Sequence, residues 1–290
     1  MLHREEGAGA IVAGALALPM FKPITPQPVQ RDILQQVAST YVELCKAAVS
    51  KQTSDGFRRY IDSVIQSKAT LHRHVRAFEL YAPYLKGGDR ILDWGCRHAP
   101  DACMIRVYLG DQVDLHGCDR LDTAAGEFGD FFAFAKLQHK YLSHVYNLPY
   151  DAGEFDVVLS SGVLEHVAKE EQSLQEIWRV LKPRGLFIIT FLPNYFSFSE
   201  RMSRLLRTYA GHTRLYTFGK IRDRLLSNGF AIEKQGYHQV FPTFAKGVSN
   251  AKLARLGDGL CRLNPAFEKA FPLSALSANL YLVARKVEAM

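Results

Sequence analysis

Short apolar runs alternate with helical segments from residue 90 onward, and this alternation constrains the fold more than any other feature. Short runs rich in β-branched and aromatic residues predict strands, whereas apolar residues three or four positions apart predict helices. Strands are predicted at 90–94, 113–118, 141–145, 155–160, 185–191, 230–241 and 280–285, and helices at 101–109, 128–137 and 169–181. The alternation indicates an α/β fold, with helices covering both faces of a mostly parallel sheet. The strand after the sixth is expected at the sheet edge.

The chain is expected to have three parts. Pro23, Pro26 and Pro28 interrupt regular structure, so residues 1–30 are expected to form a flexible N-terminal tail and linker. Residues 31–86 carry three helical patterns and are expected to form a helical appendage. Residues 87–290 form the main domain, with helical cap insertions at about 195–228 and 243–276.

Composition places few limits on partners and location. The 36 basic and 29 acidic residues give a net charge of +7, which permits an anionic partner without requiring one. Five cysteines without a Cys-x-x-Cys pair are typical of reduced thiols, so we expect a cytoplasmic protein. Residues 7–20 have the length of a signal-peptide core, but the preceding residues lack net positive charge, which makes export the less favoured reading. No stretch has 18 consecutive apolar residues, so no membrane-spanning helix is predicted.

Two predicted strands end in an acidic residue, and both ends are suited to a nucleotide. Asp93 closes the first strand and precedes Gly95, in a polar turn that leads into a helix. In an open α/β sheet such a strand end faces a nucleotide-sized crevice, where glycine lets the ligand approach the backbone. Asp119 closes the second strand, where a carboxylate can accept hydrogen bonds from ribose hydroxyls. The plain structural reading is that each residue only starts a turn.

Four segments occur in an order and spacing that are specific as a set. They are Leu92-Asp93-Trp94-Gly95-Cys96, Gly117-Cys118-Asp119, residues 148–167 and residues 176–186. With these segments the chain resembles the class I S-adenosylmethionine-dependent methyltransferases of type 11, and within them the small-molecule branch that includes ubiquinone-biosynthesis and sugar O-methyltransferases. The resemblance covers residues 71–240 and the terminal strand. It implies a Rossmann-like, seven-stranded, mostly parallel sheet with an antiparallel last strand, and S-adenosyl-L-methionine as cofactor.

The resemblance assigns cofactor contacts to residues at the strand ends. They are Asp93, Gly95, Cys96 and Arg97 around the methionine portion, Asp119 and Arg120 at the ribose, His144 and Val145 at the adenine, and Ser161 beside the methyl group. The family loop usually reads Gly-x-Gly-x-Gly, whereas Arg97 and Ala99 replace two of its glycines here. Arg97 could pair with the cofactor carboxylate or fold outward onto Asp101 or Glu127. His144 stands where relatives usually carry an acidic residue.

Other functions of this architecture would leave marks that the chain lacks. A dinucleotide-binding dehydrogenase needs three glycines in a Gly-x-Gly-x-x-Gly loop, and residues 95–100 supply one. Methyltransferases that act on base amines of nucleic acids usually carry Asn/Asp-Pro-Pro-aromatic after the fourth strand, where this chain reads Ser-Ser-Gly-Val. Cytosine C5 methylation needs a Pro-Cys pair, which is absent. Nucleic acid is therefore not the expected partner.

His166 is the candidate catalytic residue. Methyl transfer from a sulfonium requires mainly alignment in a dry pocket. A hydroxyl acceptor also benefits from a base, and an imidazole placed just after the fourth strand titrates near neutral pH. The alternative is that Glu165 and His166 only orient the loop. The histidines have no recognised zinc spacing, so no metal is expected.

The two insertions are expected to select the acceptor. Residues 195–217 are aromatic and arginine-rich, which suits an acceptor with an apolar portion and negative charge, suits single-stranded RNA, or reflects a solvated helix face. Residues 243–276 are suited to a membrane surface or a second subunit, and the oligomeric state is not predicted. The function hypothesis is O-methylation of a small-molecule, lipid-linked or glycan acceptor. The alternatives are C-methylation of a quinone-type substrate and a methyltransferase-like binding module without catalysis.

Overall fold

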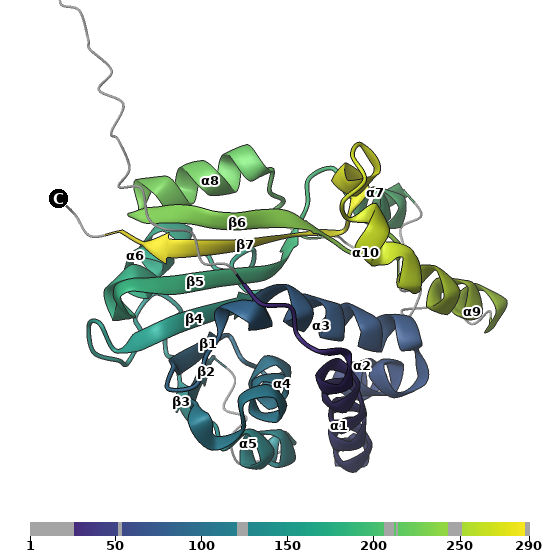
Figure 1. Ribbon diagram of the computed structural model, residues 1–290, viewed down its shortest axis with the longest axis horizontal. Coiled ribbons are helices and arrows are strands. Elements are labelled where there is room, and N and C mark those ends of the chain that lie inside the picture. The colour runs from purple at the N-terminus through teal and green to yellow at the C-terminus, as the bar shows by residue number, and fades with distance from the viewer. Residues whose placement is uncertain are drawn as a thin grey trace, which may run out of the picture.

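One sheet forms the centre of the molecule (Figure 1). The computed structural model describes residues 26–51, 54–120, 127–205, 212, 214–242 and 251–287, and within these residues seven strands pair in the order β3-β2-β1-β4-β5-β7-β6. The strands are β1 Arg90–Trp94, β2 Asp114–Asp119, β3 Gln138–Tyr141, β4 Phe155–Ser161, β5 Leu181–Pro193, β6 Phe230–His238 and β7 Asn279–Lys286. Pairing is parallel from β3 to β5, and β7 is antiparallel to β5 and β6. The predicted mostly parallel sheet with an antiparallel last strand is confirmed.

Two details of the predicted sheet are wrong. The last strand was expected at the sheet edge, but β7 lies between β5 and β6. Leu282 and Val283 of β7 are both fully buried, one in each core, which is typical of an interior strand. Most of β6, at the sheet edge, is only half-buried. The third strand was expected at 141–145 but spans Gln138–Tyr141. As an exposed edge strand it is polar, and the apolar Leu142 and Val145 that suggested a strand follow it and pack beneath it.

Each face of the sheet carries its own apolar core, because successive residues of a buried strand point to opposite sides. In β1, Ile91 belongs to the core shared with the N-terminal helices, and Leu92 belongs to the core on the other face. The first core is covered by α1 Arg31–Val49, α2 Asp55–Gln66, α3 Lys68–Tyr81, α4 Pro100–Leu109 and α5 Gly129–Ala135. The second is covered by α6 Glu170–Val180 and α8 Phe218–Ser227 (Figure 1).

Serine caps fix where two of the N-terminal helices begin. The Ser54 side chain accepts a hydrogen bond from the Phe57 N–H at the start of α2, and Ser67 accepts one from the Thr70 N–H at the start of α3. Such caps satisfy backbone donors that the first helical turn leaves unpaired. The helices predicted for residues 31–86 are therefore present. These helices share the first core with α4 and α5. That residues 31–86 form a separate helical appendage stays a prediction.

Three helices of the two cap insertions, α7, α9 and α10, lie at one end of the molecule in Figure 1, whereas α8 lies along the sheet beside β6. The first insertion contains α7 Phe198–Leu205 and α8, and Tyr216 between them pairs with Asn194 in an isolated bridge, so the continuous helical segment expected at 195–228 is interrupted. The second contains α9 Ala251–Leu260, η3 Cys261–Leu263, α10 Asn264–Phe267 and η4 Leu273–Leu276. None of the described helices is long and apolar enough to cross a membrane. The signal-peptide question concerns residues 7–20, which lie outside the described residues.

Candidate functional site

Asp93 ends β1 as a buried carboxylate, with 3% of its surface exposed. Its Oδ2 atom has no hydrogen-bond partner among the described residues. Burial, and then the nearby carboxylates Asp101 and Asp119, raise the pKa of Asp93 well above its ordinary value. Asp101 is satisfied within the protein, because its Oδ1 accepts a hydrogen bond of 2.6 Å from the Tyr81 hydroxyl. Asp93 is therefore the carboxylate at this strand end that lacks a compensating donor.

The loop after β1 has left-handed residues at three alternate positions, of which only Gly95 is a glycine. Gly95, Arg97 and Ala99 have φ angles of 74°, 47° and 56°, so every second residue is left-handed. Residues with a Cβ adopt this region at a cost of about 1–2 kcal/mol each. At Gly95 no side chain fits, since a Cβ would lie 2.5 Å from Val163 Cγ2. The substitutions at 97 and 99 thus preserve the backbone path of the loop.

Asp119 at the end of β2 faces this loop. Its Oδ2 accepts a hydrogen bond of 2.9 Å from the Arg97 backbone N–H, which ties the two strand ends together. Cys96 is buried between them, and its Sγ would lie 2.9 Å from a Cβ built on Gly117. Arg120 follows as an exposed residue. The structure therefore brings Asp93, the loop and Asp119 to one place.

The Arg97 side chain packs on the N-terminal helices. Its guanidinium lies over the Phe57 ring, 4.7 Å from the centroid, and 5.9 Å from the centroid of Tyr60. The neighbouring His98 is buried and its Nε2 lies 3.0 Å from the Tyr41 hydroxyl. Sequence reasoning offered an outward contact with Asp101, but that carboxylate is buried against Tyr81 instead. Aromatic side chains from α1 and α2 therefore support the loop, a contact that no local pattern indicated.

The remaining predicted cofactor residues occupy two further places. His144 is exposed, with Nδ1 3.3 Å from Ser143 Oγ and its ring 5.2 Å from that of Tyr146. Val145 is partly buried against the second core. Ser161 ends β4, beside β1, and its Oγ accepts a hydrogen bond of 3.0 Å from Thr190. Their contacts with a cofactor stay predictions.

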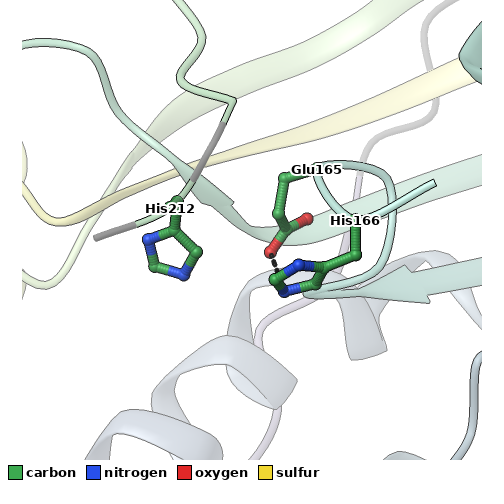
Figure 2. A group of neighbouring side chains, drawn as sticks. All are labelled: Glu165, His166 and His212. Atoms are coloured by element: carbon green, nitrogen blue, oxygen red, sulfur yellow. Dashed lines mark ion pairs between the residues drawn. The ribbon is translucent and has the colours of Figure 1, made fainter. Parts of the chain in front are cut away.

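Glu165, His166 and His212 form a cluster at the tip of β4 (Figure 2). One atom of each side chain lies within 4.8 Å of the others, and Figure 2 shows the two imidazole rings beside the Glu165 carboxylate. Glu165 Oε1 is 3.7 Å from His166 Nε2, and the same oxygen lies 3.7 Å from a Cβ built on Gly162. His212 comes from the first insertion and is held by Glu200, whose Oε2 is 3.3 Å from His212 Nδ1. The sequence named His166 as the candidate catalytic residue and Glu165 only as a residue that could orient the loop with it.

The environment of the cluster changes the proton affinity of its members. Burial raises the pKa of Glu165 to about 7, against smaller opposing effects of a backbone hydrogen bond and Arg214. Burial, His212 and Arg214 lower the pKa of His166, although 60% of its side chain is exposed. Oε2 of Glu165 has no hydrogen-bond partner among the described residues. A carboxyl group with a raised pKa and an imidazole with a lowered pKa are thus adjacent, which is a common arrangement for proton transfer.

The cluster also has the donor types of a metal site, since histidine nitrogens and a carboxylate oxygen are ligands for zinc and similar ions. However, Arg214 brings a positive charge close enough to affect the pKa of both Glu165 and His166. That charge would oppose a divalent cation. The cluster is therefore a poorer metal site than its donor types alone suggest.

Comparison with known proteins agrees with this architecture. Residues 92–189 match the model of a family described as a methyltransferase domain. A probable S-adenosylmethionine-dependent methyltransferase of Mycolicibacterium smegmatis is 25% identical over 175 residues, which are 60% of this chain and 64% of that protein. The arsenite methyltransferase of Aquipseudomonas alcaligenes is 30% identical over 117 residues, 37% of this chain and 33% of that protein. The chain thus spans less than two thirds of the length of either relative.

Solved structures share the fold at low sequence identity. A Thermotoga maritima protein described as an S-adenosylmethionine-dependent methyltransferase, possible histamine N-methyltransferase, superposes with a TM-score of 0.55 at 16% identity, covering 82% of this chain and 98% of that one. The Haloferax volcanii methyltransferase solved with its Trm112 activator gives 0.52 at 16% identity, over 76% and 90% of the two chains. At this identity the likeness concerns the fold alone.

The strand order, the strand-end carboxylates and the superpositions define a Rossmann-like methyltransferase fold. Residues 92–189 match the model of a methyltransferase domain, and the chain has the fold of the class I S-adenosylmethionine-dependent methyltransferases, whose cofactor is S-adenosyl-L-methionine. The residues present fit that cofactor. It carries a sulfonium and an ammonium group, and Asp93 offers a buried carboxylate oxygen without a partner. Asp119 lies next to it at the adjacent strand end, where a ribose would be held.

Proposed function

We propose that the protein transfers a methyl group from S-adenosyl-L-methionine to an oxygen atom of a small-molecule acceptor. The observation that carries this proposal is the Glu165–His166–His212 cluster at the tip of β4. In parallel α/β sheets ligands bind beyond the carboxyl ends of the strands, and β1 and β4 are neighbours in this sheet. A proton-accepting group therefore lies on the strand next to the one that presents Asp93.

The cofactor would be held by groups from three strand ends. Asp93 and the backbone of the loop at Gly95–Arg97 would hold the methionine portion, and Asp119 with Arg120 the ribose. The segment at His144 and Val145 would lie against the adenine, and Ser161 beside the reacting methyl group. When bound, the cofactor supplies an electrophilic methyl group on a positively charged sulfur. Alignment of the acceptor oxygen with that methyl group is then the main task of the protein.

His166 is the proposed proton acceptor. Its exposed ring can reach a bound acceptor, and its lowered pKa keeps the imidazole neutral at neutral pH. The acceptor hydroxyl would give its proton to a ring nitrogen of His166 as the new O–C bond forms. Glu165 would stabilise the resulting imidazolium, because its Oε1 lies 3.7 Å from Nε2. Placing His166 beside Glu165 thus serves both proton uptake and charge stabilisation.

Several classes of acceptor molecule are compatible with the proposed reaction. A lipid-linked or glycan hydroxyl agrees with insertions that expose aromatic side chains near the cluster. Other relatives include a sterol 24-C-methyltransferase of Pneumocystis carinii and a demethylmenaquinone methyltransferase of Symbiobacterium thermophilum, so C-methylation of a quinone-type acceptor is the second candidate. A binding module without catalysis is the third. All five cysteines are buried and unpaired, which supports the proposed cytoplasmic location.

Calorimetric titration with S-adenosylhomocysteine tests the cofactor assignment. We expect binding by the wild type, and Asp119→Ala should weaken it by about 1–3 kcal/mol because a charged hydrogen-bond acceptor is lost. Unchanged affinity would remove Asp119 from the ribose site, and no binding at millimolar ligand would favour the binding module.

Mass spectrometry of a cell extract incubated with isotope-labelled cofactor would identify the methylated product. Once the acceptor is known, His166→Ala should lower turnover by about 100-fold while cofactor affinity is retained. Full turnover of that variant across neutral pH would reject the proton-acceptor role.

A further inference from the structure

The two cap insertions expose large apolar side chains to an unusual degree. Among the described residues, ten of the twelve exposed large hydrophobic side chains come from these insertions. The apolar patch is defined by Tyr195, Phe196, Phe198, Phe271, Leu273 and Leu276, with exposed fractions from 42% for Leu276 to 82% for Phe271. Single exposed apolar residues are ordinary on soluble proteins, but a concentration of this kind marks an interaction surface.

The two halves of the patch are held together although they lie far apart in sequence. The buried side chain of Asn194, directly before Tyr195, donates hydrogen bonds of 2.8 Å to the carbonyls of Ala275 and Ser277. The first aromatic segment is therefore fixed beside the segment that carries Leu273 and Leu276. Figure 1 shows α7 and the chain after α10 at the same end of the molecule. The two segments of the patch are thus anchored to each other and are not independent loops.

In the elements that carry the patch, basic side chains are exposed and acidic side chains are turned inward. Exposed basic residues belong to the same two insertions: Arg201 on α7, Arg262 on η3 and Lys269 after α10. Acidic residues of the same elements are turned into the protein. Glu200 bonds to His212, and Glu268 is 93% buried, with its oxygens on Arg76 and the Gln239 N–H. The surface presented outward is therefore apolar and positive.

We propose that this apolar patch binds the surface of a membrane that contains anionic lipids. Apolar side chains enter the headgroup region, and nearby basic residues are attracted to anionic headgroups, so both properties of the patch contribute. A second copy of this chain would bring the same positive charges together, which disfavours self-association through the patch. A nucleic acid would match the charge but would leave aliphatic Leu273 and Leu276 without a stacking role.

The location of the patch connects it with the reaction. Glu200 of α7 accepts a hydrogen bond from the His212 N–H and also contacts its ring, so the patch borders the cluster at the tip of β4. Resting on the proposed function, the consequence is that the acceptor is a lipid-soluble molecule which reaches the site from the membrane. The membrane contact itself does not depend on catalysis.

Vesicle flotation with the full chain tests the contact. Phosphatidylcholine vesicles with and without phosphatidylglycerol are the probes, and the protein should float only with the anionic vesicles. The double variant Phe271→Ser/Leu273→Ser should weaken binding about tenfold or more, because two large apolar side chains no longer enter the lipid. The control Leu226→Ser removes an exposed leucine on α8 and should float like the wild type. Arg262→Gln should weaken binding about fivefold, and added salt should weaken binding of the wild type.

Several results would overturn the inference. They are absence of flotation with both vesicle types, equal flotation of the double variant and the wild type, and a dimer in light scattering that the double variant alone abolishes. Retention of single-stranded RNA that depends on Arg262 but not on Phe271 would also contradict it. S-adenosylhomocysteine titration of every variant checks folding. Cofactor binding without flotation removes the membrane contact and leaves the proposed function standing, whereas flotation without cofactor binding does the reverse.

Discussion

Replacement of Asp93 by asparagine should make the protein more stable and its cofactor binding weaker. Asp93 is 3% exposed, its Oδ2 has no partner among the described residues, and two further carboxylates lie close to it. An ionised carboxylate in such a place is unfavourable in the folded protein. Asparagine has nearly the same shape without the charge. The substitution therefore separates the cost of the charge from the packing of the side chain.

The pH dependence of the effect follows from the raised pKa of Asp93, and its size follows from the unpartnered oxygen. When the folded pKa lies above the unfolded value, ionisation destabilises the folded state. The penalty is absent below the ordinary value of 3.8, grows as the pH rises toward the folded pKa, and is constant above it. A buried acceptor without a hydrogen-bond partner costs about 1–3 kcal/mol, and Oδ2 of Asp93 is such an acceptor. We therefore expect Asp93→Asn to be more stable than the wild type by about 1 kcal/mol or more at neutral pH.

Urea denaturation at several pH values measures this gain. The difference between Asp93→Asn and the wild type should shrink as the pH falls toward about 4. S-adenosylhomocysteine should bind the variant about tenfold or more weakly, because a charged hydrogen-bond acceptor is lost. The control Asp223→Asn, on the exposed face of α8, should change stability by less than about 0.5 kcal/mol. A variant less stable than the wild type at neutral pH would refute the reasoning, since it would mean that the Asp93 charge is compensated.

Two further substitutions test the site and its support. Ionisation of Glu165 destabilises the folded protein by a penalty that grows between pH 4.5 and about 7 and reaches about 3 kcal/mol. Glu165→Gln removes this penalty, so the stability of the variant relative to the wild type, measured by urea denaturation, should rise over that range. The exposed control Glu43→Gln should show no such rise. Phe57→Ala should cost about 3–5 kcal/mol, because a buried ring beneath Arg97 is lost; a thermal midpoint equal to that of the wild type would show that the loop does not depend on α2.

The strands that sequence reasoning located well are those buried on both faces. β1 matched its predicted range at both ends and β4 matched to one residue, because interior parallel strands read as continuous apolar runs. β3 was displaced because an exposed edge strand carries no such run. The position of β7 between β5 and β6 depends on long-range pairing, and nothing in the residues of one strand specifies its neighbours.

Some residues of the candidate site could be located from the sequence, and others could not. Asp93 and Asp119 could be found because each closes a strand, and parallel neighbours bring their ends together. His212 and Glu200 join the cluster through the fold of the first insertion, which brings together residues 12 positions apart in a way that a local sequence pattern does not specify. The stacking of Arg97 on Phe57 links residues from separate helical and loop segments, and the sequence offers no signal for it.

The loop after β1 depends on helices that lie outside the family-matched residues. Glycines let this turn adopt its left-handed residues unaided, whereas Arg97 and Ala99 keep the same path at an energetic cost. The contacts of α2 with Arg97, and of Tyr41 with His98, supply compensation from outside the family-matched residues 92–189. The left-handed residues of the loop and the helices that pack against it are therefore energetically coupled. A domain cut at the family boundary would inherit the strain without its support.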